Sequence, residues 1–254
     1  MARSKSMIVA MADLGMALDL KIIKGTLIAL AILGPVFAVL CIGVPLALIE
    51  LGPDTNMLLA FVMPMVTSMI GMLSLVPAAY ISANSIVGER EQNTLEPLLS
   101  TPLTDRELLW GKILSSLIPS ALLLASQTLT SSIGVNIVLI LARRPLIMFP
   151  DLPGLFLLAV VAPLLILAAV SMMIIISGKV SRVYEAYQGV GAIVLVFMIP
   201  MLGPLLTMIG TDTPNPTQTW LWNLFTFLVA VVLVCSSWTI AVRRFNRNQM
   251  VSRI

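Results

Sequence analysis

Six long segments without a single charged side chain constrain what this chain can fold into. Each is at least about 20 residues long, which is what a helix needs to cross the hydrocarbon core of a bilayer. The segments are continuous and rich in Leu, Ile, Val, Ala and Met, so they favour helices over the short alternating strands of a membrane barrel. They are Thr26–Ile49, Met57–Ala83, Ile113–Ala142, Gly154–Ser177, Gly189–Ile209 and Leu221–Val242.

Composition supports a membrane protein and excludes other classes. Of the 254 residues, 59% are hydrophobic and 11% are charged, whereas a soluble domain carries about 25% charged residues. Disordered chains are polar and charged, so disorder is excluded as well. The sequence contains no histidine, which removes every histidine-based catalytic or metal site. We therefore predict an all-α, multi-pass membrane protein with six spans that binds no metal or cofactor itself.

The distribution of Lys and Arg predicts the orientation of the spans. Thirteen of the 15 such residues fall in the N-terminal arm, in the loops after the second and fourth segments, or in the C-terminal tail. Since Lys and Arg accumulate on the cytoplasmic side, we expect a plasma-membrane protein with both termini in the cytoplasm. Arg143 and Arg144 are then an exception on the outer side, for which the sequence offers no reason.

Three regions follow from this layout. We expect residues 1–25 to form an amphipathic helix on the inner membrane surface, residues 26–242 to form the six-span domain, and residues 243–254 to form a basic tail. A disordered N-terminal arm is the alternative, because Leu20 interrupts the polar arc of the helix. The expected apolar face holds Met7, Met11, Leu14, Leu18 and Ile22, and the opposite arc holds Asp13, Lys21 and Lys24.

The loop 88–112, between the second and third segments, holds five of the 12 acidic residues of the chain. Thr94 is suited to cap a short helix over residues 95–100, because its hydroxyl can accept a hydrogen bond from an amide of the first turn. The leucines of this helix would form a small apolar face rimmed by charges. Such a helix, held between two spans, is suited to insert into a groove of a soluble partner. An ordinary solvated loop is the alternative.

A second helix is predicted to begin at the end of this loop. Pro102 interrupts the chain, because proline lacks the amide that a continuing helix needs. Thr104 and Glu107 have the spacing of a capping box, in which each side chain bonds the backbone amide of the other residue. We therefore expect a helix that starts after Thr104, carries Trp110 at the membrane interface and continues into the third segment.

The residues of this loop resemble the signature loop of permeases of the type-2 ABC exporter family. Asn93 stands where many members have Gly. In the loop after the fourth segment, Glu185 and Gln188 resemble a run of sodium-efflux-like members, and Arg182 lies in the same loop. The resemblance in the loop 88–112 rests on Glu89, Arg90, Glu91, Thr94, Leu95, Glu96, Leu98, Leu99, Thr101 and Pro102, followed by Gly111 and Lys112.

The resemblance implies the membrane subunit of an ATP-driven exporter. Two permeases, identical or paralogous, would pair in the lipid bilayer to form the translocation path. Two copies of a cytoplasmic ATPase subunit would dock on the loop 88–112, and the ten residues from Glu89 to Pro102 named above would make the coupling contact. ATP and Mg²⁺ would bind to the ATPase, and no nucleic acid would be involved. Cargoes of the family include ions, drugs, peptides, lipids and glycans, and the resemblance leans towards sodium or drug efflux.

The chain lacks the phosphate-binding loop of an ATPase, so we expect it not to be an enzyme. The pattern G-x-x-x-x-G-K-[ST] fails at Gly111–Lys112, because Arg106 occupies the first glycine position and Ile113 the last position. The uncharged segments also disfavour a proton-coupled carrier, since they contain no titratable acid or base to carry the coupling. An ATP-independent channel or secondary carrier is the alternative function.

Polar residues in the second and third segments are candidates for lining a translocation path. Gln127 and Ser131 lie one helical turn apart and share a face. The alternative is hydrogen bonding between helices, which we favour because it is common in membrane bundles. Pro200 and Pro204, with Gly203 between them, would break the fifth segment. The path candidates are Tyr80, Asn84, Gln127 and Ser131.

Overall fold

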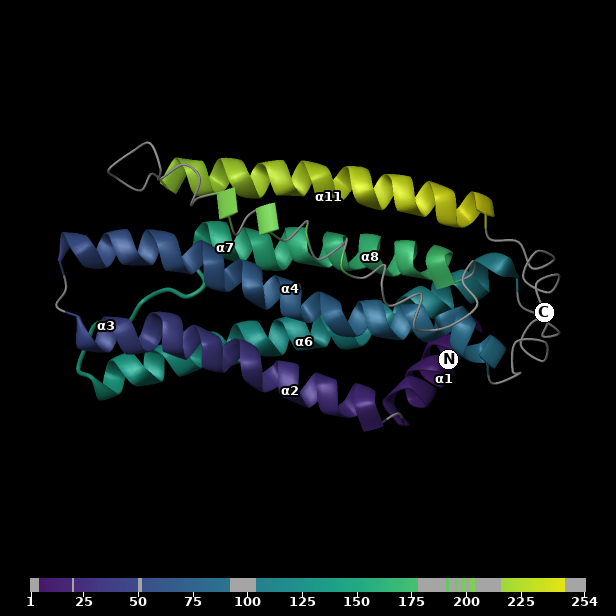
Figure 1. Cartoon of the computed structure of the whole chain (residues 1–254), viewed down its shortest axis with the longest axis horizontal. Coiled ribbons are helices and arrows are strands. Elements are labelled where there is room, and N and C mark those ends of the chain that lie inside the picture. The colour runs from purple at the N-terminus through teal and green to yellow at the C-terminus, as the bar shows by residue number, and fades with distance from the viewer. Residues whose placement is uncertain are drawn as a thin grey trace.

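The computed structural model shows an elongated bundle of helices that run side by side (Figure 1). The structure describes residues 5–19, 21–49, 52–91, 104–177, 191, 195, 198–199, 202–203 and 216–244. All the regular structure in these residues is helical, and no strand occurs among them. The all-α prediction is therefore confirmed for the described part of the chain.

Five stretches of the described chain are long and apolar enough to cross a membrane: Ile23–Leu48, Thr55–Asn84, Arg106–Leu141, Leu152–Ser177 and Thr217–Ala241. They match the first four predicted segments and the sixth. The fifth, Gly189–Ile209, lies mostly outside the described residues, so the count of six stays a prediction. In chain order the helices are α1 (Lys5–Asp19), α2 (Lys21–Ala38), η1 (Val39–Gly43), α3 (Val44–Leu48), α4 (Pro53–Glu91), α6 (Asp105–Leu141), α7 (Leu152–Phe156), η2 (Leu157–Val161), α8 (Ala162–Ser177) and α11 (Pro216–Arg244).

The long helices alternate in direction along the bundle. The ends of α4, α8 and α11 and the starts of α2 and α6 lie together with α1 at one end (Figure 1). We call this the α1 end. Both helices that flank the middle of the loop 88–112 therefore reach the same end of the molecule, beside the N-terminal helix.

Two of the spans contain a five-residue π-helical turn, and each turn lies just before a proline. Pro45 follows η1, and Pro163 follows η2. Proline has no amide to bond the carbonyl four residues earlier. In η1 the amide of Val44 instead donates to the carbonyl of Val39, five residues back, and an equivalent bond closes η2. Both spans continue through their prolines, with the π-helical turn taking up the change in hydrogen bonding.

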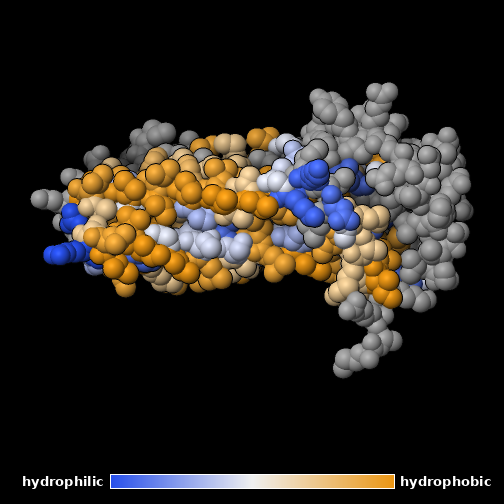
Figure 2. All heavy atoms as spheres, turned by 90° about the horizontal axis from the view of Figure 1, so that it is seen from below, coloured by the Kyte–Doolittle hydropathy of each residue, from blue (hydrophilic) through white to orange (hydrophobic). Residues whose placement is uncertain are grey.

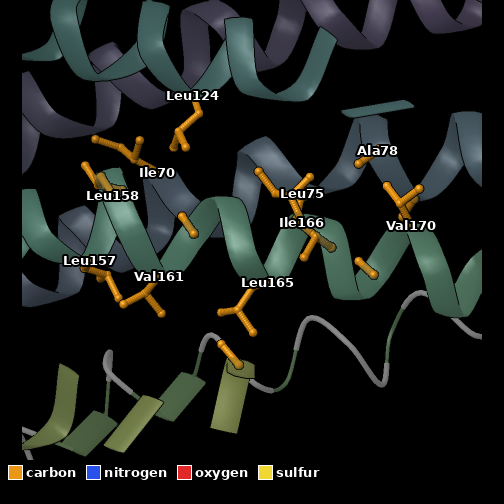
Figure 3. Packing of buried hydrophobic residues seen from close by; sticks show 14 of the residues in the cluster. Ile70, Leu75, Ala78, Leu124, Leu157, Leu158, Val161, Leu165, Ile166 and Val170 are labelled. Atoms are coloured by element: carbon orange, nitrogen blue, oxygen red, sulfur yellow. The ribbon is translucent and has the colours of Figure 1, made fainter. Parts of the chain in front are cut away.

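The core lies between the three central spans (Figure 3). Ile70 and Leu75 of α4 pack near Leu158 of η2 and Ile166 of α8, and Leu124 of α6 closes the cluster at the side of Ile70. In the spans of α4, α6 and α8, 56–61% of the residues in the most apolar window are buried. The remaining two spans, on α2 and α11, sit at the periphery of this core.

The outer spans expose apolar faces that suit contact with lipid. In the windows on α2 and α11 only 22% of the residues are buried. Figure 2 shows apolar residues over most of the long surface seen from below. A water-soluble monomer rarely exposes an apolar surface of this extent. These faces agree with a multi-pass membrane protein.

The N-terminal segment is helical, as predicted, but one of its acids lies in an unexpected place. Val9 and Ala10 of α1 are buried against the rest of the chain, while Ile8, Met11 and Met16 expose an apolar face. Asp13 was expected on the polar arc of this helix, opposite its apolar face. It lies instead against α6, where only 12% of its side chain is exposed.

Candidate functional site

The structure describes both helices that flank the predicted coupling loop, but not the loop's centre. α4 continues to Glu91, so Glu89, Arg90 and Glu91 belong to the last turn of a 39-residue helix. The short helix over residues 95–100 stays a prediction. The coupling candidates outside the described residues are Thr94, Leu95, Glu96, Leu98, Leu99, Thr101 and Pro102.

α6 begins at the predicted capping box. The backbone amide of Glu107 donates to Thr104 Oγ1 at 3.2 Å, and the amide of Thr104 donates to Glu107 Oε2 at 2.9 Å. These two bonds satisfy amides that the first turn of a helix leaves without partners. The capping box is confirmed, and it places the start of a long, regular helix directly after residues 92–103.

The start of α6 holds α1 through a buried ion pair. Lys112 Nζ lies 3.5 Å from Asp13 Oδ2, and the side chain of Lys112 is 1% exposed. Burial raises the pKa of Asp13, and the neighbouring Lys112 charge partly offsets that rise. The sequence does not indicate this pair, because Lys112 stands just before the apolar segment and Asp13 lies on the arc of its helix opposite the apolar face.

Gly111 allows the two helices to approach closely. A Cβ atom at Gly111 would lie 2.7 Å from the Cβ of Val9 and 3.0 Å from the carbonyl oxygen of Ser6. Real side chains do not approach that closely, so only glycine fits between α1 and α6 at this point. The Gly-Lys pair of the signature thus serves the contact with α1 through both of its residues.

An aromatic contact joins the same part of α6 to the last span. The rings of Trp110 and Trp238 have centroids 4.8 Å apart and are tilted by 53°. Trp110 is exposed on one side, as expected for a residue at a membrane interface. The first two turns of α6 therefore contact both the first helix of the chain and the last.

A serine joins the ends of α4 and α8. Ser177, the last residue of α8, donates a hydrogen bond to the carbonyl of Ala83 at 2.7 Å. Its oxygen also accepts one from the amide of Val87 at 3.1 Å. The candidates of the following loop, Arg182, Glu185 and Gln188, lie outside the described residues.

Gln127 links three helices. Its Nε2 donates to the carbonyl of Leu30 on α2 at 2.6 Å, and its Oε1 accepts from Ser74 Oγ on α4 at 3.0 Å. The side chain is fully buried, and it lies beside Gly34, where a Cβ atom would come within 3.1 Å of it. This geometry favours hydrogen bonding between helices over an open path at Gln127.

The other path candidates lie on α6 and farther along α4. Ser131, one turn beyond Gln127, is buried, and its Oγ has no hydrogen-bond partner among the described residues. Asn84 donates to the carbonyl of Tyr80, one turn earlier on the same helix, at 3.1 Å. Tyr80 stands six residues beyond Ser74 on α4, which is about 9 Å of helix. Their assignment to a path stays a prediction.

Comparison with known proteins adds one match. A family model described as ABC-2 family transporter protein matches residues 3–231. The match covers about nine-tenths of the chain and includes α1, the loop 88–112 and most of α11. No curated protein matches the chain.

Proposed function

The chain belongs to the ABC-2 family of transporter proteins, and on this premise we propose that it is the permease subunit of an ATP-driven exporter. Family membership makes it a multi-pass membrane component of an ABC transporter. In the proposal, two copies, or this chain and a paralogue, form the translocation path. Two copies of a separate ATPase subunit, which bind ATP and Mg²⁺, dock on the loop 88–112. The permease lies in the plasma membrane, and both of its termini and this loop face the cytoplasm.

The position of the loop between two long helices carries the proposal. The apolar span on α4 ends at Asn84, but the helix continues for about two more turns to Glu91. On the other side α6 starts at Asp105, eight residues before the uncharged segment begins at Ile113. The last turn of α4 and the first turn of α6 thus place charged residues on both sides of residues 92–103. A loop that joins two polar helix ends is suited to meet a soluble subunit.

ATP hydrolysis is assigned to the partner because this chain has no phosphate-binding loop. Its uncharged segments also leave no group for proton coupling inside the membrane. The cargo leans towards sodium or drugs on the resemblance of Glu185 and Gln188 to sodium-efflux-like members.

Co-purification from the native membrane tests the proposal. We expect an ATPase that contains a phosphate-binding loop to come down with the full-length chain, and Glu96→Lys or Leu98→Arg to release it. Arg144→Gln, at the opposite end of the bundle, is the matched control and should leave the ATPase bound. If the purified chain instead transports in vesicles without nucleotide or partner, it is a channel or secondary carrier.

A further inference from the structure

Asp13 and Lys112 form a buried ion pair between two helices that are far apart in the sequence. Their charged atoms lie 3.5 Å apart, and their side chains are 12% and 1% exposed. A second ion pair of the same residue types provides a contrast in the same region. Asp19 and Lys24 lie 4.0 Å apart, and their side chains are 87% and 57% exposed. An exposed pair contributes little to stability, whereas removal of one partner of a buried pair is strongly destabilising.

The surroundings of the buried pair are shaped for contact between helices. Gly111, next to Lys112, leaves room for Val9 and the backbone of Ser6. Val9 and Ala10 are buried in the same contact. Burial is the larger influence on the pKa of Asp13 and raises it, while Lys112 lowers it. The ion pair forms only while α1 is docked against α6. Undocking would move Asp13 away from Lys112 and into water.

The pair also lies close to the coupling loop. Lys112 is the eighth residue of α6, about two turns beyond the Thr104–Glu107 capping box. A helix transmits displacement along its axis because its backbone is fully bonded. Movement of residues 92–103 would reach the start of α6 first, and through Lys112 it would reach α1.

We propose that Asp13 and Lys112 act as an ionic clasp that joins α1 and the first two turns of α6 into one rigid unit. In this role they are positioning residues, which make the coupling loop and the N-terminal helix move together when the ATPase acts. The docking of α1 stands on the geometry alone. Its role in coupling rests on the proposed function.

Distances between spin labels test the docking in the permease alone. Labels are placed at Met16 of α1 and Arg106 of α6, both exposed, after Cys41 and Cys235 are replaced by Ala. We expect one narrow distance distribution in this background. Asp13→Asn or Lys112→Gln should add a second, longer distance, with the ratio of undocked to docked α1 raised about a hundredfold or more. Exchange of the two charges, D13K with K112D, should restore the narrow distribution.

ATP hydrolysis in the complex with the ATPase tests the coupling. Each single variant should lower the kcat of ATP hydrolysis by the complex about tenfold or more, while the KM for ATP, set on another chain, changes by less than about twofold. The charge exchange should recover most of the rate. Asp19→Asn and Lys24→Gln, in the exposed pair, are the matched controls and should leave both the distances and the rate unchanged.

The outcomes separate the two proposals. The clasp is overturned if the single variants Asp13→Asn and Lys112→Gln keep the narrow distance distribution. It is also overturned if they undock α1 without lowering kcat. If the single variants fail to accumulate in the membrane, but the charge-exchange variant accumulates and keeps the narrow distance and the kcat, the clasp is supported. If the charge exchange fails as well, the clasp is wrong, because the site then requires more than opposite charges. Failure of any ATPase to bind the unmodified chain refutes the proposed function and leaves the label distances as a separate result.

Discussion

The two helices that flank the coupling loop are held at the α1 end by different chemistry. α4 is joined to α8 through Ser177, a neutral hydroxyl that bonds two backbone groups. α6 is joined to α1 through the buried charges of Asp13 and Lys112. A neutral hydrogen bond of this kind contributes only about 1 kcal/mol to stability. Separation of a buried ion pair costs more, because the carboxylate loses its neighbouring positive charge at a place that water reaches poorly.

This difference predicts how the two junctions respond to force on the loop. The hydrogen bonds of Ser177 can be exchanged for others when the ends of α4 and α8 shift slightly, because a serine hydroxyl can bond other nearby backbone carbonyls. The α1–α6 junction should move as one unit. The contact between Trp110 and Trp238 extends that unit towards α11. We therefore expect substitutions at the α1–α6 junction to have larger effects than equivalent ones at the α4–α8 junction.

The largest effect is expected from Lys112→Met. Loss of the counter-charge leaves Asp13 buried and unpaired, which should lower the free energy of unfolding by about 3–5 kcal/mol. Thermal unfolding of the purified chain in detergent measures this. The matched variant, Asp13→Leu combined with Lys112→Met, removes both charges and should recover most of the loss. An equal loss in the single and double variants would contradict the comparison.

Lowering the pH should partly rescue Lys112→Met. Burial already raises the pKa of Asp13, and removal of Lys112 takes away the charge that lowers it. The folded chain then binds a proton at a higher pH than the unfolded chain does. Stability should rise as the pH falls through the raised pKa, since the folded state takes up more protons in that window. Asp13→Leu with Lys112→Met should not show this rise.

Gly111→Leu should have the next largest effect. A Cβ at this position already lies 2.7 Å from the side chain of Val9, so α1 must move away. Overpacking of this kind costs about 1–3 kcal/mol. Gly15→Ala is the matched control, because a Cβ there meets nothing within 4 Å. It should be neutral or slightly stabilising, since alanine is the better helix former. Thermal unfolding of the two variants shows whether the loss comes from the close contact at Gly111 or from the replacement of any glycine in these two helices.

What the sequence could predict depended on how local each signal was. The first span was predicted at Thr26–Ile49 and is found at Ile23–Leu48, because the absence of charge marks a membrane segment wherever it packs. The capping box at Thr104 was predicted because both of its partners lie within one turn. The helix that starts after Thr104 was predicted to continue into the third segment, and α6 does so. The burial of Lys112 against α1 was not predicted.

The contacts between helices could not be predicted from the sequence, because they depend on how distant segments pack. The clasp joins residues far apart in the sequence, and a helical wheel of α1 shows only which residues share a face. Gln127 bonds a backbone carbonyl at Leu30, and a carbonyl leaves no mark in the sequence. The pattern of polar residues in the spans therefore indicated two roles for Gln127, a path lining or a bond between helices, and only the packing of α2 and α4 against α6 distinguishes them.

Ser177→Ala tests the weaker junction. The variant removes the bonds to Ala83 and Val87 between α8 and α4, and it should cost about 1–2 kcal/mol. Ser171→Ala is the matched control on the same helix, because its hydroxyl bonds only the carbonyl of Leu167 within α8. The control should change thermal stability far less. If Ser177→Ala costs as much as Lys112→Met, the two junctions do not differ in the way that their chemistry predicts.

Thr104→Ala should have the smallest effect and sharpens the comparison on the side of α6. The bonds of the capping box are exposed, so their loss should cost about 0.5–1 kcal/mol, at the lower end of the range for N-caps. Thr104→Ser keeps an acceptor oxygen and should be nearly neutral. Hydrogen exchange at the amides of Glu107 and Leu108 should rise in Thr104→Ala, while the amides beyond Lys112 stay protected. Protection that is lost past Lys112 would mean that the cap, and not the clasp, holds the start of α6 in place.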